Sequence, residues 1–147
     1  MSIEVLEIIS KAMSALGLEY GFGEYKGKTA EETAEETAEQ TEEQETRIVY
    51  PYFVGEYMET EPTTEDGLQE TTFILTGFSR GEDARLTLED AKNEIEKHFN
   101  PSTGRVGITN SGSAVVIFYA GAVPVPKEDA ELKSIQINLS IKEWKVI

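Results

Sequence analysis

The chain has 147 residues, no cysteine, and 28 acidic against 13 basic residues, for a net charge of −15. This length fits one domain, the lack of thiols excludes disulfides and thiolate metal sites, and the charge disfavours a nucleic-acid-binding surface. No apolar run approaches the roughly 18 residues of a membrane span, and the N-terminus lacks the basic region and cleavage site of a signal peptide. We therefore expect a soluble protein of the cytoplasm or of an assembly.

The first elements expected are a helix and a strand. Ser2 is suited to cap a helix whose apolar residues recur at helical spacing, and Gly17 should end it. Residues 18–25 then have the character of a strand that leads into an acidic run. The apolar helix positions are Leu6, Ile9, Met13 and Leu16, flanked by Val5, Ile8 and Ala12.

Thr29 to Thr46 is a near-repeat of Thr, Ala, Glu and Gln that contains eight glutamates and no base. It lacks large apolar side chains, so nothing offsets the entropy cost of ordering it. Ala, Glu and Gln favour a helix, but Thr at every fourth position and repulsion between glutamates four residues apart oppose one. We predict a disordered or mobile acidic loop inside a single domain that spans residues 1–147.

Strands are predicted on both sides of a turn after the acidic run. Residues 47–57 are apolar or aromatic on both alternating faces, which predicts a strand covered on both sides. Pro51 lacks a donor and places this strand at an edge or at a bulge. Asp66-Gly67 predicts a turn, and residues 71–78 alternate as a second strand.

A second helix and a hairpin follow. Thr87 is expected to open the helix, with Asp90 completing a capping box, and Asn100-Pro101 to end it. Residues 106–109 and 114–119 flank a turn signal and predict a hairpin. The inner stripe of the helix consists of Leu88, Ala91, Ile95 and Phe99.

The last strand should have one buried and one wet face. Pro124 and Pro126 should break the chain before it, and apolar residues alternate with polar ones from Ile135 to Ile141. Trp144 and Val146 are out of phase, which a bulge near Glu143 or a partner on the outer face would explain. The predicted fold class is α+β: a mostly antiparallel sheet with two helices packed on one face and a long acidic loop.

Catalytic signals are weak. Gly27-Lys28-Thr29 ends like a phosphate-binding loop, but Phe22 stands where that motif needs glycine. His98, the single histidine, lies near the C-terminal end of the second helix, where a cation suits the dipole, and one histidine cannot supply a two-His metal face. We predict no enzyme, no cofactor and no metal site.

Other polar groups have ordinary explanations. Turn acids could hold a cation through oxygen, but their spacing matches no EF-hand loop and solvation is the better explanation. The charges around Gly81 predict local ion pairing, and Ser111 and Ser113 have no base near them in sequence. The aromatic residues of 47–57 fit core and edge packing better than base stacking, because no base follows Arg47 among them. The turn acids are Glu59, Glu61, Glu65 and Asp66, and the charges are Arg80, Asp83 and Arg85.

Four segments, in their order after the first helix, resemble the small tail-completion proteins of long-tailed phages and prophages. The resemblance covers nearly the whole chain except the acidic run. It implies a tail terminator, an α+β protomer that forms a hexameric ring on the head-proximal end of the tail tube. The segments are LGLEYGFGEY (16–25), RIVYPYFVGEY (47–57), EDGLQETTFILTGFSRG (65–81) and LKSIQINLSIKEWKVI (132–147).

The resemblance also implies the partners. The ring would stop tube polymerisation, join the tail to the head connector and leave a channel through which DNA passes without specific binding. The partners would be further copies of the chain, the tail tube protein and the connector protein, with no membrane. The protein would be assembled in the host cytoplasm and would end in the neck of the virion.

Assembly proteins act through interfaces, so edges and apolar patches are the candidate sites. These residues could equally lie inside the monomer core, and the acidic loop could point inward or outward. The candidate interface residues are Tyr50, Tyr52, Phe53, Tyr57, Trp144 and Val146. The candidate channel-lining residues are Glu31, Glu32, Glu35, Glu36, Glu39, Glu42 and Glu43.

A different function is a small acidic phage inhibitor that mimics nucleic acid. Such a mimic needs negative charges on a rigid surface at the spacing of phosphates. Eight of the acids here are concentrated in one run with no large apolar residue to fix it, which disfavours this alternative.

Overall fold

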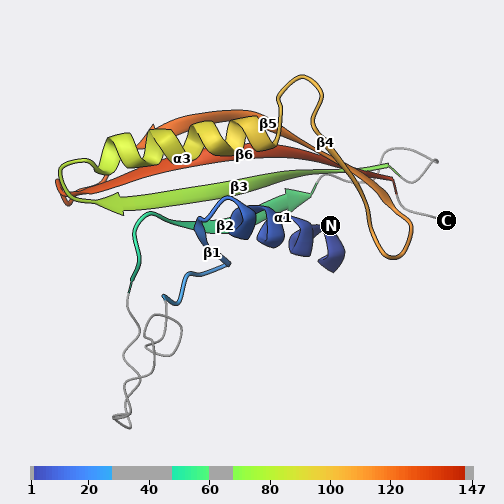
Figure 1. Cartoon of the computed structure of the whole chain (residues 1–147), viewed down its shortest axis with the longest axis horizontal. Helices are drawn as coiled ribbons and strands as arrows, with labels where there is room; N and C mark the ends of the chain where they lie inside the picture. The colour runs from blue at the N-terminus through green and yellow to red at the C-terminus, as the bar shows by residue number, and fades with distance from the viewer. Residues whose placement is uncertain (1, 28–47, 60–67, 145–147) are drawn as a thin grey trace, which may run out of the picture.

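The computed structural model describes residues 2–27, 48–59 and 68–144 (Figure 1). The predicted acidic loop at 29–46, the Asp66-Gly67 turn and Val146 lie outside these ranges. The elements in chain order are α1 (Ile3–Ala15), β1 (Glu19–Phe22), β2 (Tyr52–Glu59), β3 (Leu68–Arg80), α3 (Ala84–His98), β4 (Arg105–Ile108), β5 (Ala114–Val125) and β6 (Leu132–Trp144).

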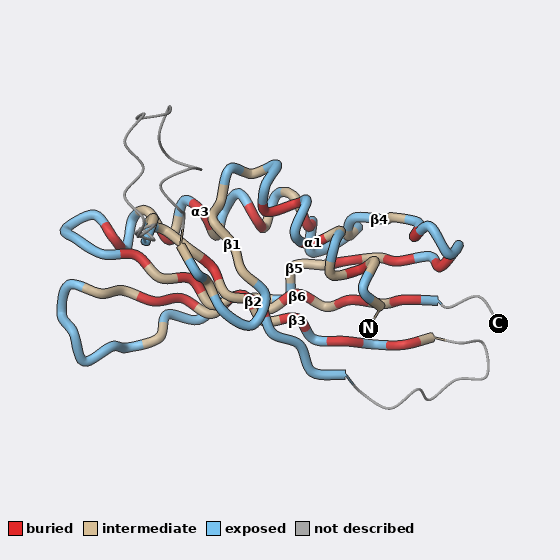
Figure 2. The backbone as a smooth tube through the Cα atoms, turned by 90° about the horizontal axis from the view of Figure 1, so that it is seen from below, coloured by how far each residue is buried: buried red, intermediate tan, exposed pale blue. Residues whose placement is uncertain are grey.

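The strands form one sheet in the order β1-β2-β3-β6-β5-β4. Only β1 and β2 pair in parallel; every other neighbouring pair in this sheet is antiparallel. Both helices lie on the same side of the strands, and their apolar stripes meet in one core (Figure 2). The predicted α+β class, with a mostly antiparallel sheet and both helices on one face, is confirmed.

The core lies between the helices and the inner face of the sheet. The apolar stripes predicted for the two helices are confirmed, because their residues are buried together with alternate residues of β3, β5 and β6. Each large apolar side chain buried in this way contributes about 1.5–3 kcal/mol. The central members are Ile9, Met13, Ile95, Phe99, Phe73, Leu75, Ile117, Ile137 and Leu139.

Both ends of α1 have specific partners. Gly17 has a positive φ of 72°, and the next residue, Leu18, donates its backbone N–H to the Met13 carbonyl at 3.0 Å, so the helix ends where predicted. Ser2 precedes the helix but makes no side-chain cap. Its hydroxyl donates instead to Glu143 Oε2 of β6 at 3.0 Å. Ser2 thus occupies the N-cap position as predicted, but without the side-chain bond of a cap, and a carboxylate from β6 lies at the positive end of the helix dipole.

Helix α3 begins three residues earlier than predicted. It starts at Ala84, so Thr87 lies within its first turn. The Thr87 hydroxyl donates to the Asp83 carbonyl at 2.9 Å, and this local bond replaces the predicted capping box.

Strand β2 is an interior strand. Pro51, preceded by a cis peptide bond, comes directly before it, and β1 and β3 flank it on both sides. The edge or bulge position predicted from Pro51 is wrong, because the proline lies outside the paired segment. The two-sided cover predicted for this strand is also wrong: Met58 on the outer face is 66% exposed.

The phase change at the end of β6 does not come from a bulge in that strand. The β3–β6 register runs without a break from Leu68 opposite Trp144 to Arg80 opposite Leu132, so the bulge predicted near Glu143 is wrong. Glu143 continues the inward-facing series and is 2% exposed. Trp144 therefore lies on the outer face of the sheet.

The irregularity lies in β5, between Tyr119 and Ala122. Strand β5 continues through Pro124, which is in register with Ile135, although this proline was predicted to break the chain. The proline is tolerated because β4 pairs only with Ala114–Ile117, so the later part of β5 is an edge.

Two glycines in the central strands leave room for aromatic rings. A Cβ added at Gly77 would overlap the Phe53 ring, and one at Gly55 would come within 2.5 Å of Phe73 Cζ. We expect Gly77→Ala to lower the free energy of unfolding by about 1–3 kcal/mol through overpacking. Denaturant titration measures this loss.

Gly107→Ala is the matched control, because its nearest neighbour, Ile8 Cδ1, would be 3.7 Å from the new carbon. An equal loss in both variants would contradict the packing explanation.

Candidate assembly interface

The described residues hold no group of three or more histidines and acids that could bind a metal ion. The Ser111 hydroxyl donates to Glu4 Oε2 at 2.8 Å, and this bond lowers the pKa of the Glu4 carboxyl. It joins the β4–β5 turn to α1. Of the helices that the structure describes, none has the length and apolar character needed to cross a membrane.

His98 is the last residue of α3, as predicted. Its ring contacts the Phe99 ring edge-on at 4.7 Å. Burial, and secondarily the charge of Arg105, lowers the pKa of His98 below its ordinary value of 6.5. The lowered pKa favours the neutral ring, which disfavours the cation predicted at this helix end.

An aromatic cluster lies on the outer face, at the β2–β3 end of the sheet where Tyr52 pairs with Phe78. The Tyr52 ring stacks on Tyr25 at 4.6 Å and on Phe78 at 5.1 Å, and it also contacts Tyr50 at 5.6 Å. No described helix covers this face, so the rings are half-buried only by one another. Burial by these neighbours is the main reason that the pKa of Tyr52 is raised.

Two cations lie at this aromatic cluster. The Lys127 ammonium is 5.1 Å from the centre of the Phe78 ring, and a hydrogen bond to Tyr50 is the main cause of the raised pKa of Arg80. The sequence prediction found no base among these aromatics because both cations come from other segments of the chain. Cation–aromatic contacts of this kind contribute about 0.5–1 kcal/mol at exposed sites.

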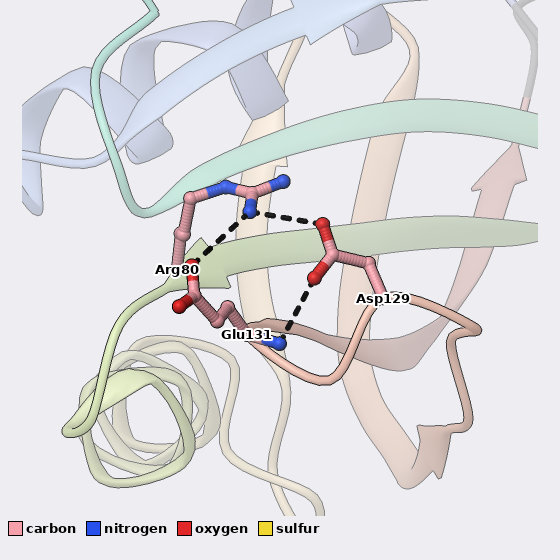
Figure 3. A network of polar contacts seen from close by, with 3 residues as sticks. All are labelled: Arg80, Asp129 and Glu131. Atoms are coloured by element: carbon pink, nitrogen blue, oxygen red, sulfur yellow. Dashed lines mark hydrogen bonds and ion pairs between the residues drawn. The ribbon is translucent and has the colours of Figure 1, made fainter.

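Nearby acids partly neutralise the cluster. Arg80 forms ion pairs with Asp129 at 2.9 Å and with Glu131 at 3.8 Å (Figure 3). The Glu131 backbone N–H donates a hydrogen bond to the Asp129 carboxylate. This bond, together with Arg80, lowers the pKa of the Asp129 carboxyl. The local ion pairing predicted around Gly81 is therefore wrong for Arg80, because its acids come from the β5–β6 connection.

The same cluster holds together the described segments that flank the acidic run. Tyr25 precedes the run and Tyr52 follows it, and their rings are stacked. The Val49 backbone N–H also donates to the Tyr25 hydroxyl at 3.4 Å. The described residues before and after the run therefore lie next to each other in the folded body.

The two edges of the sheet expose apolar side chains. On β4, Val106 is 73% and Ile108 is 76% exposed. At the end of β1, Phe22 is 47% exposed and stacks on Tyr57, which is 41% exposed. Apolar side chains on an unpaired edge favour association with another chain.

Most of the predicted interface residues lie on the surface. Tyr50 and Tyr57 are exposed, Tyr52 is half-buried, and Trp144 is 37% exposed on the outer face. Phe53 is fully buried beside Gly77. It is a core residue, which corrects its inclusion among the interface candidates.

The sequence prediction missed the exposed side chains of both edges. Phe22 was weighed only as a departure from a phosphate-binding motif, and Val106 and Ile108 only as hairpin residues. The available signal was the position of these apolar residues in short strands at the two ends of the sheet. That signal becomes clear only when the strand order is known.

No known family model matches the chain, and no curated protein matches it. The class of protein is therefore inferred from the residues, the fold and the exposed surfaces described above.

Proposed function

We propose that this chain is a tail terminator of a long-tailed phage or prophage, the class whose members its segments resemble. Several copies form a ring on the head-proximal end of the tail tube, stop its polymerisation and join it to the head connector. The family resemblance implies that the ring is a hexamer. The protein acts through its surfaces, without a catalytic step or a cofactor.

The exposed apolar residues of edge strand β4 are the observation that carries this proposal. Val106 and Ile108 are more than two-thirds exposed on a strand that pairs on one side only. A protein that works as a monomer blunts such an edge with charge or proline, whereas an assembly protein buries it against a neighbour.

The outer face offers a second contact surface, for the tube or the connector. Its centre mixes polar and apolar side chains: Thr76, Gln136 and Asn138 lie beside Ile74 and Val54 on adjacent strands. Aromatic side chains lie at its two ends: the Tyr52 cluster at one and Trp144 at the other. Exposed aromatic side chains are enriched at specific protein contacts.

The acidic run is assigned to the channel. Tyr25 before the run and Tyr52 after it are stacked on each other, so the described residues that flank the run lie together in the protomer. In a ring, six copies of the run would bring about 48 carboxylates to one short section of the bore. Negative charge there repels DNA phosphates and keeps the passing genome from binding.

Polymerisation of the cognate tail tube protein in the presence of this chain tests the proposal. We expect tube growth to stop, with a ring visible at one end of each tube in electron micrographs. Tubes that grow to the same length distribution with and without the protein would contradict the proposal.

A further inference from the structure

An apolar cleft lies beside the β4 edge, on the helix side of the sheet. Its volume is about 290 Å³. Apolar residues of α1 and of the inner face of β5 form its floor, and the cations Lys11 and Arg105 and the imidazole of His98 also line it, with no acid among them. The apolar lining includes Ile8, Ala12, Ala15, Phe99, Val115 and Ile117.

An apolar side chain projects at the opposite edge of the sheet, on the same side as the helices. Phe22 is the last residue of β1, two positions after Tyr20, which packs against the core. Its ring stacks against the core residue Phe73 at 6.3 Å and against Tyr57 at 5.9 Å, yet Phe22 remains 47% exposed. It is a pre-positioned aromatic group at an unpaired edge.

We propose that Phe22 of one copy docks into the cleft beside β4 of the next copy, so that the protomers associate head to tail through opposite edges of their sheets. This inference rests on the ring proposed above and names the two surfaces that close it. The cleft volume is sufficient for one aromatic ring. The cleft and Phe22 also lie on the same face of the sheet, the face that carries the helices.

The symmetry of this contact agrees with a ring. The two contact surfaces are different parts of the chain, so each copy retains one free surface of each kind until the chain of copies closes. Contacts of this heterologous type generate closed rings when the rotation between copies closes and filaments when it does not. Two identical edges could pair only as a dimer.

Charge supports the same partner. Glu19 and Glu24 lie on either side of Phe22 in the chain, and Glu24 is exposed on the β1 side, where it also forms an ion pair with Lys26 at 3.6 Å. On the other edge, Lys11 and Arg105 lie at the cleft without an acid in its lining. Complementary charges of this kind orient partners and suppress the pairing of like edges.

Two variants test the contact from its two sides. Phe22→Ser removes the docking side chain, and Ala15→Trp fills the cleft from an exposed position at the end of α1. We expect each variant to fold normally by circular dichroism and to need roughly tenfold or more protein for half-maximal capping of tail tubes. Leu86→Ala, at an exposed apolar site on α3, is the control and should cap like the wild type.

A charge exchange gives a test that a folding defect cannot mimic, because the second substitution should restore the capping that the first one loses. Arg105→Glu should weaken capping, and Glu24→Lys in the same chain should restore it, because every head-to-tail contact then contains the reversed pair. Full capping by Phe22→Ser and Ala15→Trp, alongside a capping wild type, would overturn the edge contact and leave the proposed function intact. A wild type that never caps tubes would overturn both.

Discussion

Replacing Trp144 by Ala is expected to leave the protomer folded and to abolish tail completion. Trp144 is 37% exposed on the outer face, in register with Leu68 on one side and Ala114 on the other. A partly exposed tryptophan at the end of a strand contributes little to the monomer, whereas the loss of an interface tryptophan costs 2 kcal/mol or more, roughly a thirtyfold loss of affinity. Thermal unfolding and tube capping measure the two effects.

The same assay excludes a structural explanation for Trp144. A core tryptophan would cost about 3–5 kcal/mol on truncation and the variant would lose cooperative unfolding. Leu86→Ala removes a comparable apolar side chain that is 66% exposed on α3, and it should retain both stability and capping. A folded Trp144→Ala protein that completes tails as the wild type does would contradict the assignment of Trp144 to an interface.

Changing Glu31, Glu32, Glu35 and Glu36 to lysine is expected to permit assembly but to slow or stall the exit of DNA. The four substitutions change the charge of the run from −8 to 0. The repulsion of phosphates would then be lost, and each copy would offer four lysines to the passing DNA. Because salt screens charges over about 8 Å at physiological ionic strength, the delay should increase at low salt. Single-particle ejection kinetics measure the delay.

A charge-matched control separates the bore from the rest of the surface. Glu7, Glu82, Asp90 and Glu128 are exposed on the folded body, and their change to lysine alters the net charge by the same amount. This control should eject DNA at the normal rate. Normal ejection by the variant of the acidic run, in particles that contain the full ring, would show that the run does not line the channel.

The sequence predicts those parts of the fold that local periodicity determines. The stripe of α3 and the inward series of β6 both come from spacing alone, and both are confirmed. The positions of Pro51 and Pro124 were predicted wrongly because the sequence shows only that a proline lacks a backbone N–H donor. Whether that donor was needed depends on which neighbouring strand pairs there.

Most of the candidate interface is formed by segments that are far apart in the sequence and that only strand pairing brings together. Tyr50 was identified only as part of an aromatic segment suited to an edge, and Trp144 only as a residue out of phase with its strand. Arg80 and Lys127 reach the Tyr52 cluster from β3 and from the β5–β6 connection, and no local pattern brings them there. The sequence showed that Trp144 does not follow the alternation of the buried residues in its strand. It did not show why, because the next member of the buried series is Glu143, a charged residue that one would not expect to be buried.

Imaging of assembled particles tests the central proposal most directly. With a label fused to this chain, electron cryomicroscopy should show density for the label only at the junction of head and tail, as a closed ring of about six copies around the channel. Particles whose neck lacks the label, or that carry it elsewhere on the virion, would contradict the assignment as a tail terminator.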